Sequence, residues 1–183
     1  MSLKTIGCVE LNSIAIGILT ADTMIKAAAI ELLIARTTCP GRYLIMVGGD
    51  TGSVTTAVDV GRRTGGEMVI DWFTLASIHP AILPALAGTG TVLQIQALGV
   101  IETYSTASCI LAADAAAKAG QVELIEIRSA AGLAGKAFVT LTGDVASVEA
   151  SVQAGIERIR ETSPVVSHVV IPSPAGELKQ TLL

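Results

Sequence analysis

The residue best placed to do chemistry is Cys39, in the segment Thr-Thr-Cys-Pro-Gly-Arg at residues 37–42, which separates two short apolar runs. Proline fixes its own φ and favours an extended conformation in the residue before it, while Gly41 can adopt a positive φ. The segment therefore predicts a tight turn between two strands, with Cys39 on a rigid, projecting loop. A thiol in that position could be a metal ligand, a reactive group or an ordinary loop residue.

The other two cysteines predict no chemistry of their own. Cys8 follows Gly7 in an apolar run and Cys109 lies in an alanine-rich segment, so both are expected to be small buried hydrophobes. Three widely spaced cysteines do not indicate a disulfide framework. A [4Fe–4S] cluster normally takes four thiolates, and one chain has no Cys-x-x-Cys run to supply them.

No other motif predicts catalysis. Residues 132–136, Gly-Leu-Ala-Gly-Lys, have a faint likeness to a phosphate-binding loop, but Ala137 stands where Ser or Thr would bind Mg²⁺. His79, beside Pro80, is interpreted as a loop histidine and His168 as a structural strand residue. No Ser/His/Asp set or carboxylate pair has a usable spacing, so the chain is predicted not to be an enzyme.

The composition limits the class of protein. The 183 residues are 51% hydrophobic but only 3% aromatic, and the core is expected to pack small side chains in thin layers. This length allows one domain or two small ones. A net charge of −4 gives no basic surface for nucleic acid, so no nucleic-acid partner is expected. Because only 15% of residues are charged, much of the surface is expected to be buried in an oligomer.

Membrane insertion and secretion are not predicted. Residues 72–101 contain no Asp, Glu, Lys or Arg and are long enough to span a bilayer, but Pro80, Pro84, Gly88 and Gly90 interrupt them. The N-terminus has no basic region followed by an apolar run and a cleavage site. We therefore expect a cytoplasmic protein with reduced thiols and no membrane partner.

The sequence repeats itself. Residues 6–10, Ile-Gly-Cys-Val-Glu, recur as Leu-Gly-Val-Ile-Glu at 98–102, an offset of 92. After the central turn the offset becomes 94, because the second copy has two extra residues in that turn. Further along, Pro80 matches Pro172, which predicts that the offset returns to 92. Other matched pairs are Asp22 and Asp114, Lys26 and Lys118, Arg36 and Arg128, Gly41 and Gly135, and Asp50 and Asp144. This agreement over many residue types indicates a tandem duplication.

Each copy predicts the same elements. A strand ending at Glu10 or Glu102 is followed by a helix that Ser13 or Ser105 caps. A hairpin around the central turn leads to a second helix, capped by Asp50 or Asp144, and to a fourth strand at 68–76 or 165–171. The predicted fold class is α/β, as an α+β sandwich of two tandem ferredoxin-like βαββαβ units at residues 1–90 and 91–183. A short helix at 81–87 and a linker at 88–91 are expected between them.

Several motifs give the chain a family resemblance. They are Asp-x-x-x-Lys-Ala at 22–27 and 114–119, Gly-Asp at 49–50 and 143–144, and the proline-closed segments at 78–80 and 170–172. The chain resembles tandem-domain bacterial microcompartment shell proteins, in both of its copies. The resemblance implies a homotrimer that mimics a hexamer and packs with other shell proteins into the shell of a microcompartment in the cytoplasm.

The central turn resembles one branch of that family more specifically. Thr-x-Cys-Pro-Gly at 37–41 is similar to the iron–sulfur shell protein of the propanediol-utilisation microcompartment. The resemblance implies that three Cys39 thiolates hold one [4Fe–4S] cluster per trimer at a central pore. It also implies electron transfer across the shell and encapsulated redox enzymes as partners. The pore-loop residues carried over are Thr37, Thr38, Pro40, Gly41, Ala131, Gly132 and Leu133.

Lys26 and Lys118 resemble the lysines with which neighbouring tiles of the family meet. An ordinary solvated lysine near a helix C-terminus is the alternative. The family often pairs this edge with an arginine just after the closing strand, but Ala81 and Ser173 stand there in this chain.

Other functions stay open at this point. Cys39 could be a small residue of a cluster-free tile whose pore passes metabolites. Duplicated ferredoxin-like units can also form a tandem regulatory module that binds a small ligand. A small enzyme is the least supported reading, because the sequence shows no catalytic site.

Overall fold

The computed structural model describes residues 5–129 and 132–182, which form two compact units. The described residues up to Ile78, together with those of 130–135, form the first unit. His79–Ser129 and the described residues from Lys136 onward form the second. The predicted boundary between residues 90 and 91 lies in the irregular segment between a short helix and the next strand, and remains a prediction.

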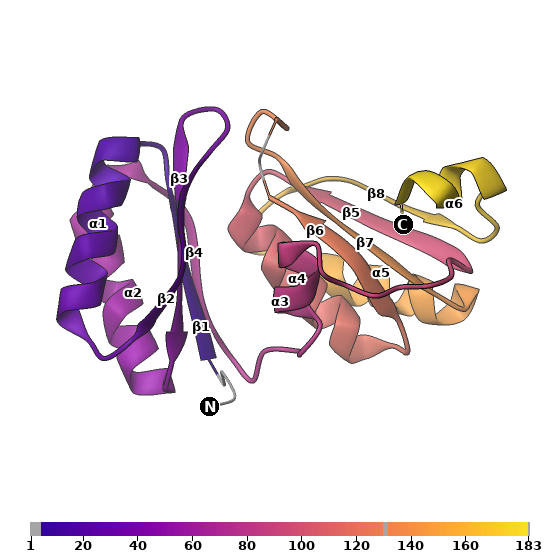
Figure 1. Cartoon of the computed structure of the whole chain (residues 1–183), viewed down its shortest axis with the longest axis horizontal. Helices are drawn as coiled ribbons and strands as arrows, with labels where there is room; N and C mark the ends of the chain where they lie inside the picture. Colours follow the sequence, from indigo (N-terminus) through magenta and orange to yellow (C-terminus); the bar gives the residue numbers. More distant parts are fainter. Residues whose placement is uncertain (1–4, 130–131, 183) are drawn as a thin grey trace. The chain divides into compact units, whose positions relative to one another are not determined.

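The first unit is a four-stranded antiparallel sheet with two helices on one face (Figure 1). Its strand order is β2-β3-β1-β4. The elements are β1 (Thr5–Leu11), α1 (Ile14–Ala27), β2 (Glu31–Thr38), β3 (Arg42–Gly49), α2 (Thr51–Gly65), a 3-10 turn (Gly66–Met68) and β4 (Val69–Ala76).

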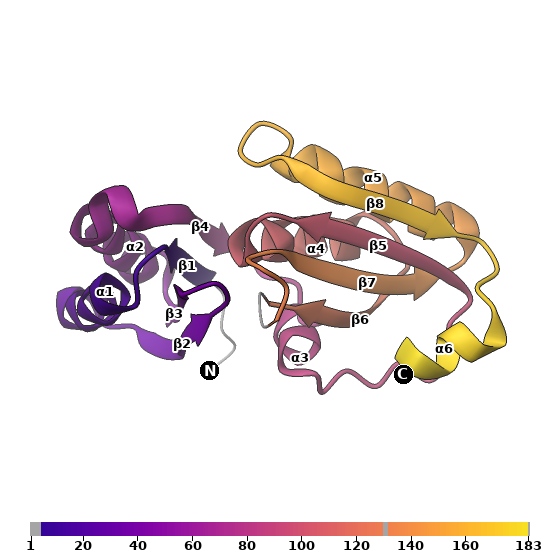
Figure 2. The same ribbon diagram turned by 90° about the horizontal axis from the view of Figure 1, so that it is seen from above.

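The second unit repeats this plan, with strand order β6-β7-β5-β8 (Figure 2). Its elements are α3 (Ile82–Ala87), β5 (Ala97–Thr103), α4 (Thr106–Ala119), β6 (Glu123–Arg128), β7 (Ala137–Gly143), α5 (Val145–Ile159), β8 (Val165–Ile171) and α6 (Gly176–Leu182). The predicted α+β class and the βαββαβ order are confirmed in both units. The terminal helix α6 was not predicted.

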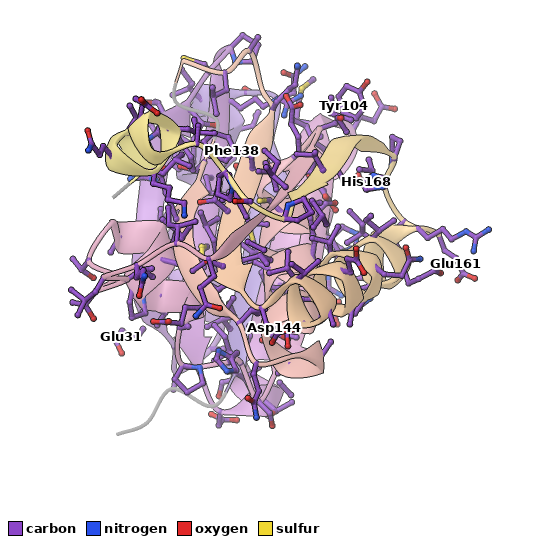
Figure 3. All side chains as sticks on the ribbon, turned by 90° about the vertical axis from the view of Figure 1, so that its right-hand side faces the viewer. Glu31, Tyr104, Phe138, Asp144, Glu161 and His168 are labelled. Carbon is purple, nitrogen blue, oxygen red and sulfur yellow. The ribbon has the colours of Figure 1, made fainter. Side chains whose placement is uncertain are left out.

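The predicted helix caps are present. Ser13 Oγ accepts the Ile16 N–H at 3.3 Å, and Asp144 Oδ1 accepts the Ser147 N–H at 3.0 Å. Such caps satisfy N–H groups of the first helical turn that have no partner within the helix. Figure 3 labels Asp144 at the start of α5.

Each core depends on a glycine in the first strand of its sheet. At Gly7 an added Cβ would overlap Val58 Cγ2, and at Gly99 it would lie 2.8 Å from Leu141 Cδ1 and 2.9 Å from Val152 Cγ2. Helices α2 and α5, which carry these valines, can therefore lie directly on their sheets. The short distance between helix and sheet requires close packing of small side chains, as the low aromatic content predicted.

The strand register corrects one part of the predicted alignment. Ile6 pairs with Leu75 in the first sheet, and its counterpart Leu98 pairs with Ile171 in the second. The offset between β4 and β8 is therefore 96, and the predicted return to 92 with Pro80 opposite Pro172 is wrong. The second copy has a longer loop between α5 and β8 than the first has between α2 and β4. Continued past the strands, the corrected offset makes Ala175 the counterpart of His79 and Leu178 that of Ile82.

The cap at Asp144 predicts how stability depends on pH. Hydrogen bonds from Ser147 lower the pKa of Asp144 below its ordinary value. The stabilisation is therefore complete above the unfolded pKa of about 3.9 and is lost as pH falls through the lower folded pKa. We expect Asp144→Ala to lower Tm at pH 7, and its difference from the wild type to shrink below pH 4. Thermal unfolding from pH 7 to pH 3 measures this.

Asp144→Asn is the matched control, because it keeps an oxygen acceptor at the cap but does not titrate. It should lie between the wild type and Asp144→Ala at pH 7. A gap between wild type and Asp144→Ala that stays constant down to pH 3 would show that the charged carboxylate does not carry the effect.

Candidate functional site

Cys39 lies at the tip of the β2–β3 hairpin, as the sequence predicted. The strands pair up to Thr38 and Arg42, and residues 39–41 form the turn, with Gly41 at a φ of 82°. The Cys39 side chain is exposed, whereas Thr38 is buried. The hairpin therefore presents a thiol to the surroundings from the end of an ordered pair of strands.

A buried ion pair anchors the base of this hairpin. Arg42 Nη1 lies 3.1 Å from Glu10 Oε1, and the Glu10 side chain is completely buried. The same nitrogen donates to the main-chain oxygen of Gly135 at 2.8 Å, within the first unit. The repeat matches Glu10 with Glu102 and, at the offset of 94, Arg42 with Lys136. It does not show which charges face each other, so this ion pair is not predicted from the sequence.

The second copy has the same pair in a more open setting. Lys136 Nζ lies 2.9 Å from Glu102 Oε1, with 42% and 33% of their side chains exposed, against 18% for Arg42. The two extra residues predicted in this turn are confirmed by the strand registers, which give an offset of 92 for β6 and 94 for β7. Of the predicted pore-loop residues here, Gly132 and Leu133 belong to the described turn, whereas Ala131 lies outside the described residues.

The remaining cysteines are buried, as predicted. Burial raises the pKa of the Cys8 thiol, and the negative charges of Glu10 and Asp71 add to this effect. Cys109 lies in the buried helix α4. Neither thiol is available to join Cys39 in a shared site.

The described residues of one chain offer no complete set of metal ligands. Within residues 5–129 and 132–182, no group of three or more His, Cys, Asp or Glu side chains is close enough to bind a metal ion. Cys39 is exposed at a hairpin tip, so it is accessible to ligands that other chains provide. The residues present therefore fit a cluster only if several copies each contribute a thiolate.

The two predicted edge lysines both form ion pairs one helical turn back. Lys26 Nζ lies 2.7 Å from Asp22 Oδ2, and Lys118 Nζ lies 2.5 Å from Asp114 Oδ2. Lys26 is more exposed than Lys118, at 73% against 40%. A role at the edge of a tile remains a prediction for both.

Both histidines belong to the second unit, whereas the Cys39 hairpin belongs to the first. His79 stands in the loop before α3, where its main-chain N–H donates to Asp114 Oδ1 at 2.8 Å. Its ring Nδ1 accepts the Ala81 N–H at 3.3 Å. His168 lies on β8 with its side chain exposed (Figure 3).

Comparison with protein families decides the class. The BMC domain matches residues 5–78 and again residues 97–174, which covers both units. The chain belongs to the BMC domain family. It is a tandem BMC protein, and its class is that of structural microcompartment shell proteins and not of enzymes.

Relatives of this tandem BMC protein are shell proteins. It is 42% identical over 171 residues to the bacterial microcompartment shell protein PduT of Citrobacter freundii, covering 93% of both chains. It is 36% identical over 85 residues to the shell protein EutM of Salmonella typhimurium, covering 46% of this chain and 86% of EutM. A crystal structure of a microcompartments protein from Desulfitobacterium hafniense superposes with a TM-score of 0.86 at 50% identity, covering 98% and 99% of the two chains.

None of the helices in the described part of this BMC protein combines the length and apolar character needed to cross a bilayer.

The two ion pairs predict unequal effects of mutation. Arg42→Ala removes a charged partner from a completely buried carboxylate, and we expect it to cost about 3 kcal/mol or more of unfolding free energy. Lys136→Ala breaks the more exposed counterpart and should cost about 0–1 kcal/mol. Urea unfolding at one fixed protein concentration measures both values.

Arg42→Lys is the control that keeps the charge, and it should recover part of the loss. Equal costs for Arg42→Ala and Lys136→Ala would contradict the assignment of the buried pair as the anchor of the Cys39 hairpin.

Proposed function

We propose that this chain forms a homotrimeric, pseudohexagonal shell tile in which three Cys39 thiolates hold one [4Fe–4S] cluster at a central pore. The observation that carries the proposal is the exposed Cys39 thiol at the tip of an anchored hairpin in a tandem BMC chain. The family membership supports the tile. The isolated thiol supports a site completed by other copies.

The stoichiometry follows from symmetry. A closed threefold assembly places the same residue of each chain at equivalent positions around one axis, so three copies of a residue close to the axis would meet there. Three copies of Cys39 would supply three of the four thiolates that such a cluster usually takes, and water or another ligand would complete the fourth iron. The second copy adds no thiol, because its counterpart of Cys39 at the 92-residue offset is Ala131.

The bound cluster would supply one-electron transfer between the two faces of the shell. The chain itself holds the thiol in place: the Glu10–Arg42 pair fixes the base of the hairpin, and Pro40 limits the conformations of its tip. Less entropy is then lost when three hairpins meet. The partners in this proposal are other shell proteins and encapsulated redox enzymes, and its location is a microcompartment shell in the bacterial cytoplasm.

A cluster-free tile with a metabolite pore is the second candidate. Thr37, Pro40 and Gly41 are exposed at the same hairpin tip, and such small side chains would suit a narrow channel. The regulatory ligand-binding module loses its basis, because the chain belongs to the BMC domain family and its relatives are shell proteins.

The proposal predicts iron in the purified protein. After anaerobic purification or reconstitution, we expect about four irons and four sulfides per three chains, a broad visible absorption band and an EPR signal on reduction or oxidation. Cys39→Ala should remove the iron while the trimer persists in sedimentation experiments. Cys109→Ala, which changes a buried cysteine of an alanine-rich helix, is the matched control and should keep the iron.

The other results separate the candidates. A colourless trimer after reconstitution would favour the metabolite pore and make Cys39 an ordinary loop residue. A stable monomer at micromolar concentration would contradict the tile itself.

A further inference from the structure

The turn between β6 and β7 reaches the base of the Cys39 hairpin. Its residues 132–135 belong to the first unit, as the hairpin does. Arg42 donates through Nη1 to Glu10 Oε1 at 3.1 Å and to the main-chain oxygen of Gly135 at 2.8 Å. These three groups, one carboxylate, one guanidinium and one carbonyl, form what we call the Arg42 clamp. The clamp joins the hairpin of the first copy to the turn of the second.

The clamp leaves no room for a side chain at residue 135. Gly135 has a φ of 90°, and a Cβ added to it would lie 2.8 Å from Arg42 Cζ and 3.0 Å from each of Nη1 and Nη2. Arg42 is only 18% exposed, and the Glu10 carboxylate that it binds is completely buried. A methyl group at residue 135 would therefore push the guanidinium away from its acceptors.

The reciprocal contact is missing from the second copy. Gly41 is the counterpart of Gly135, and a Cβ added there would meet no atom within 4 Å. Lys136, the counterpart of Arg42, binds Glu102 but no main-chain oxygen of the residues that the structure describes. The clamp thus acts in one direction, from the turn of the second copy on the hairpin that carries the exposed cysteine.

The clamp lies close to the thiol along the chain. Two residues separate Cys39 from Arg42. Arg42 also pairs with Thr38, the residue before the cysteine, at the end of the β2–β3 ladder. The place of Arg42 therefore sets where the turn projects. A functional site tolerates displacements of only about 0.5 Å in its ligands, and groups that support a ligand affect how firmly the metal is held.

We propose that the Gly135 carbonyl is a positioning group for the Cys39 thiolate. It fixes Arg42, and Arg42 fixes the hairpin in the position that a shared cluster needs. The inference rests on the cluster site of the proposed function and names the part of the second copy on which that site depends. Gly135 acts on the thiolate through Arg42, so it is a positioning residue and not a ligand.

Iron retention against a chelator tests this role. Gly135→Ala should lower the affinity for iron about tenfold, as expected when a group that supports a metal ligand is disturbed. Gly88→Ala is the matched control. Gly88 also has a positive φ, of 66°, but a Cβ added there would meet no atom within 4 Å. This variant carries the backbone strain of such a change without the contact, and it should retain iron as the wild type does.

A second background separates the contact with Arg42 from strain in the turn itself. Lysine lacks the Cζ and Nη atoms that a methyl group at residue 135 would meet, and Lys136 pairs with a glutamate at the same place in the repeat. In an Arg42→Lys chain, Gly135→Ala should therefore reduce iron retention much less than it does beside Arg42. Equal reductions in the two backgrounds would overturn the proposal.

A spin label on Cys39 measures its position without the cluster. Cys8 and Cys109 are buried, so Cys39 is the exposed thiol that a nitroxide reagent reaches. In the iron-free trimer, Gly135→Ala should broaden the distribution of label-to-label distances, whereas Gly88→Ala should leave it unchanged. Arg42→Gln, which shortens the donor and leaves the turn as it is, should broaden the distribution as well. Sedimentation and circular dichroism verify that each variant is a folded trimer.

The outcomes separate this role from the cluster itself. A wild type that binds iron, with Gly135→Ala equal to Gly88→Ala in iron retention and label distances, would overturn the positioning role and leave the cluster in place. A wild type that takes up no iron, with label distances that still change in Gly135→Ala, would overturn the cluster and support the action of Gly135 on the hairpin.

Discussion

The close approach of a helix to the first strand of each sheet is the constraint on which both units depend. Gly7 and Gly99 face the valines of α2 and α5, and no larger residue fits between them without displacing these side chains. The first strand also lies inside its sheet, between the strand that precedes the second helix and the strand that follows it. In the first unit its position therefore fixes the Cys39 hairpin, which the proposed cluster site uses, on one side and β4 on the other.

Much of this organisation could be predicted from the sequence, because duplication shows each signal twice. A serine or aspartate before an apolar helix is a weak cap signal alone, but Ser13 with Ser105 and Asp50 with Asp144 occur at matching positions, and the structure confirms all four caps. The turn at Cys39 followed from local chemistry, since proline and glycine restrict the backbone in known ways. Family membership, which the motifs of both copies indicated, is also confirmed.

The parts that could not be predicted depend on pairing across the sheet. The sequence alignment matched Pro172 with Pro80, but the hydrogen-bond register of the strands shows that β8 does not follow that offset from β4. The anchoring of Arg42 by Glu10 needs β3 to lie beside β1, which neither residue indicates alone. Equally, Asp22 and Asp114 open the same Asp-x-x-x-Lys-Ala motif, but the first is exposed and the second buried, because burial depends on what the rest of the chain places over them.

The contact between the His79 segment and helix α4 forms within one chain, so its formation does not depend on protein concentration. Since both partners belong to one polypeptide, their effective concentration is set by the linking chain and not by the amount of protein in the cell. The contact therefore forms at any protein concentration, and the surface of α4 and β6 stays covered without a second chain.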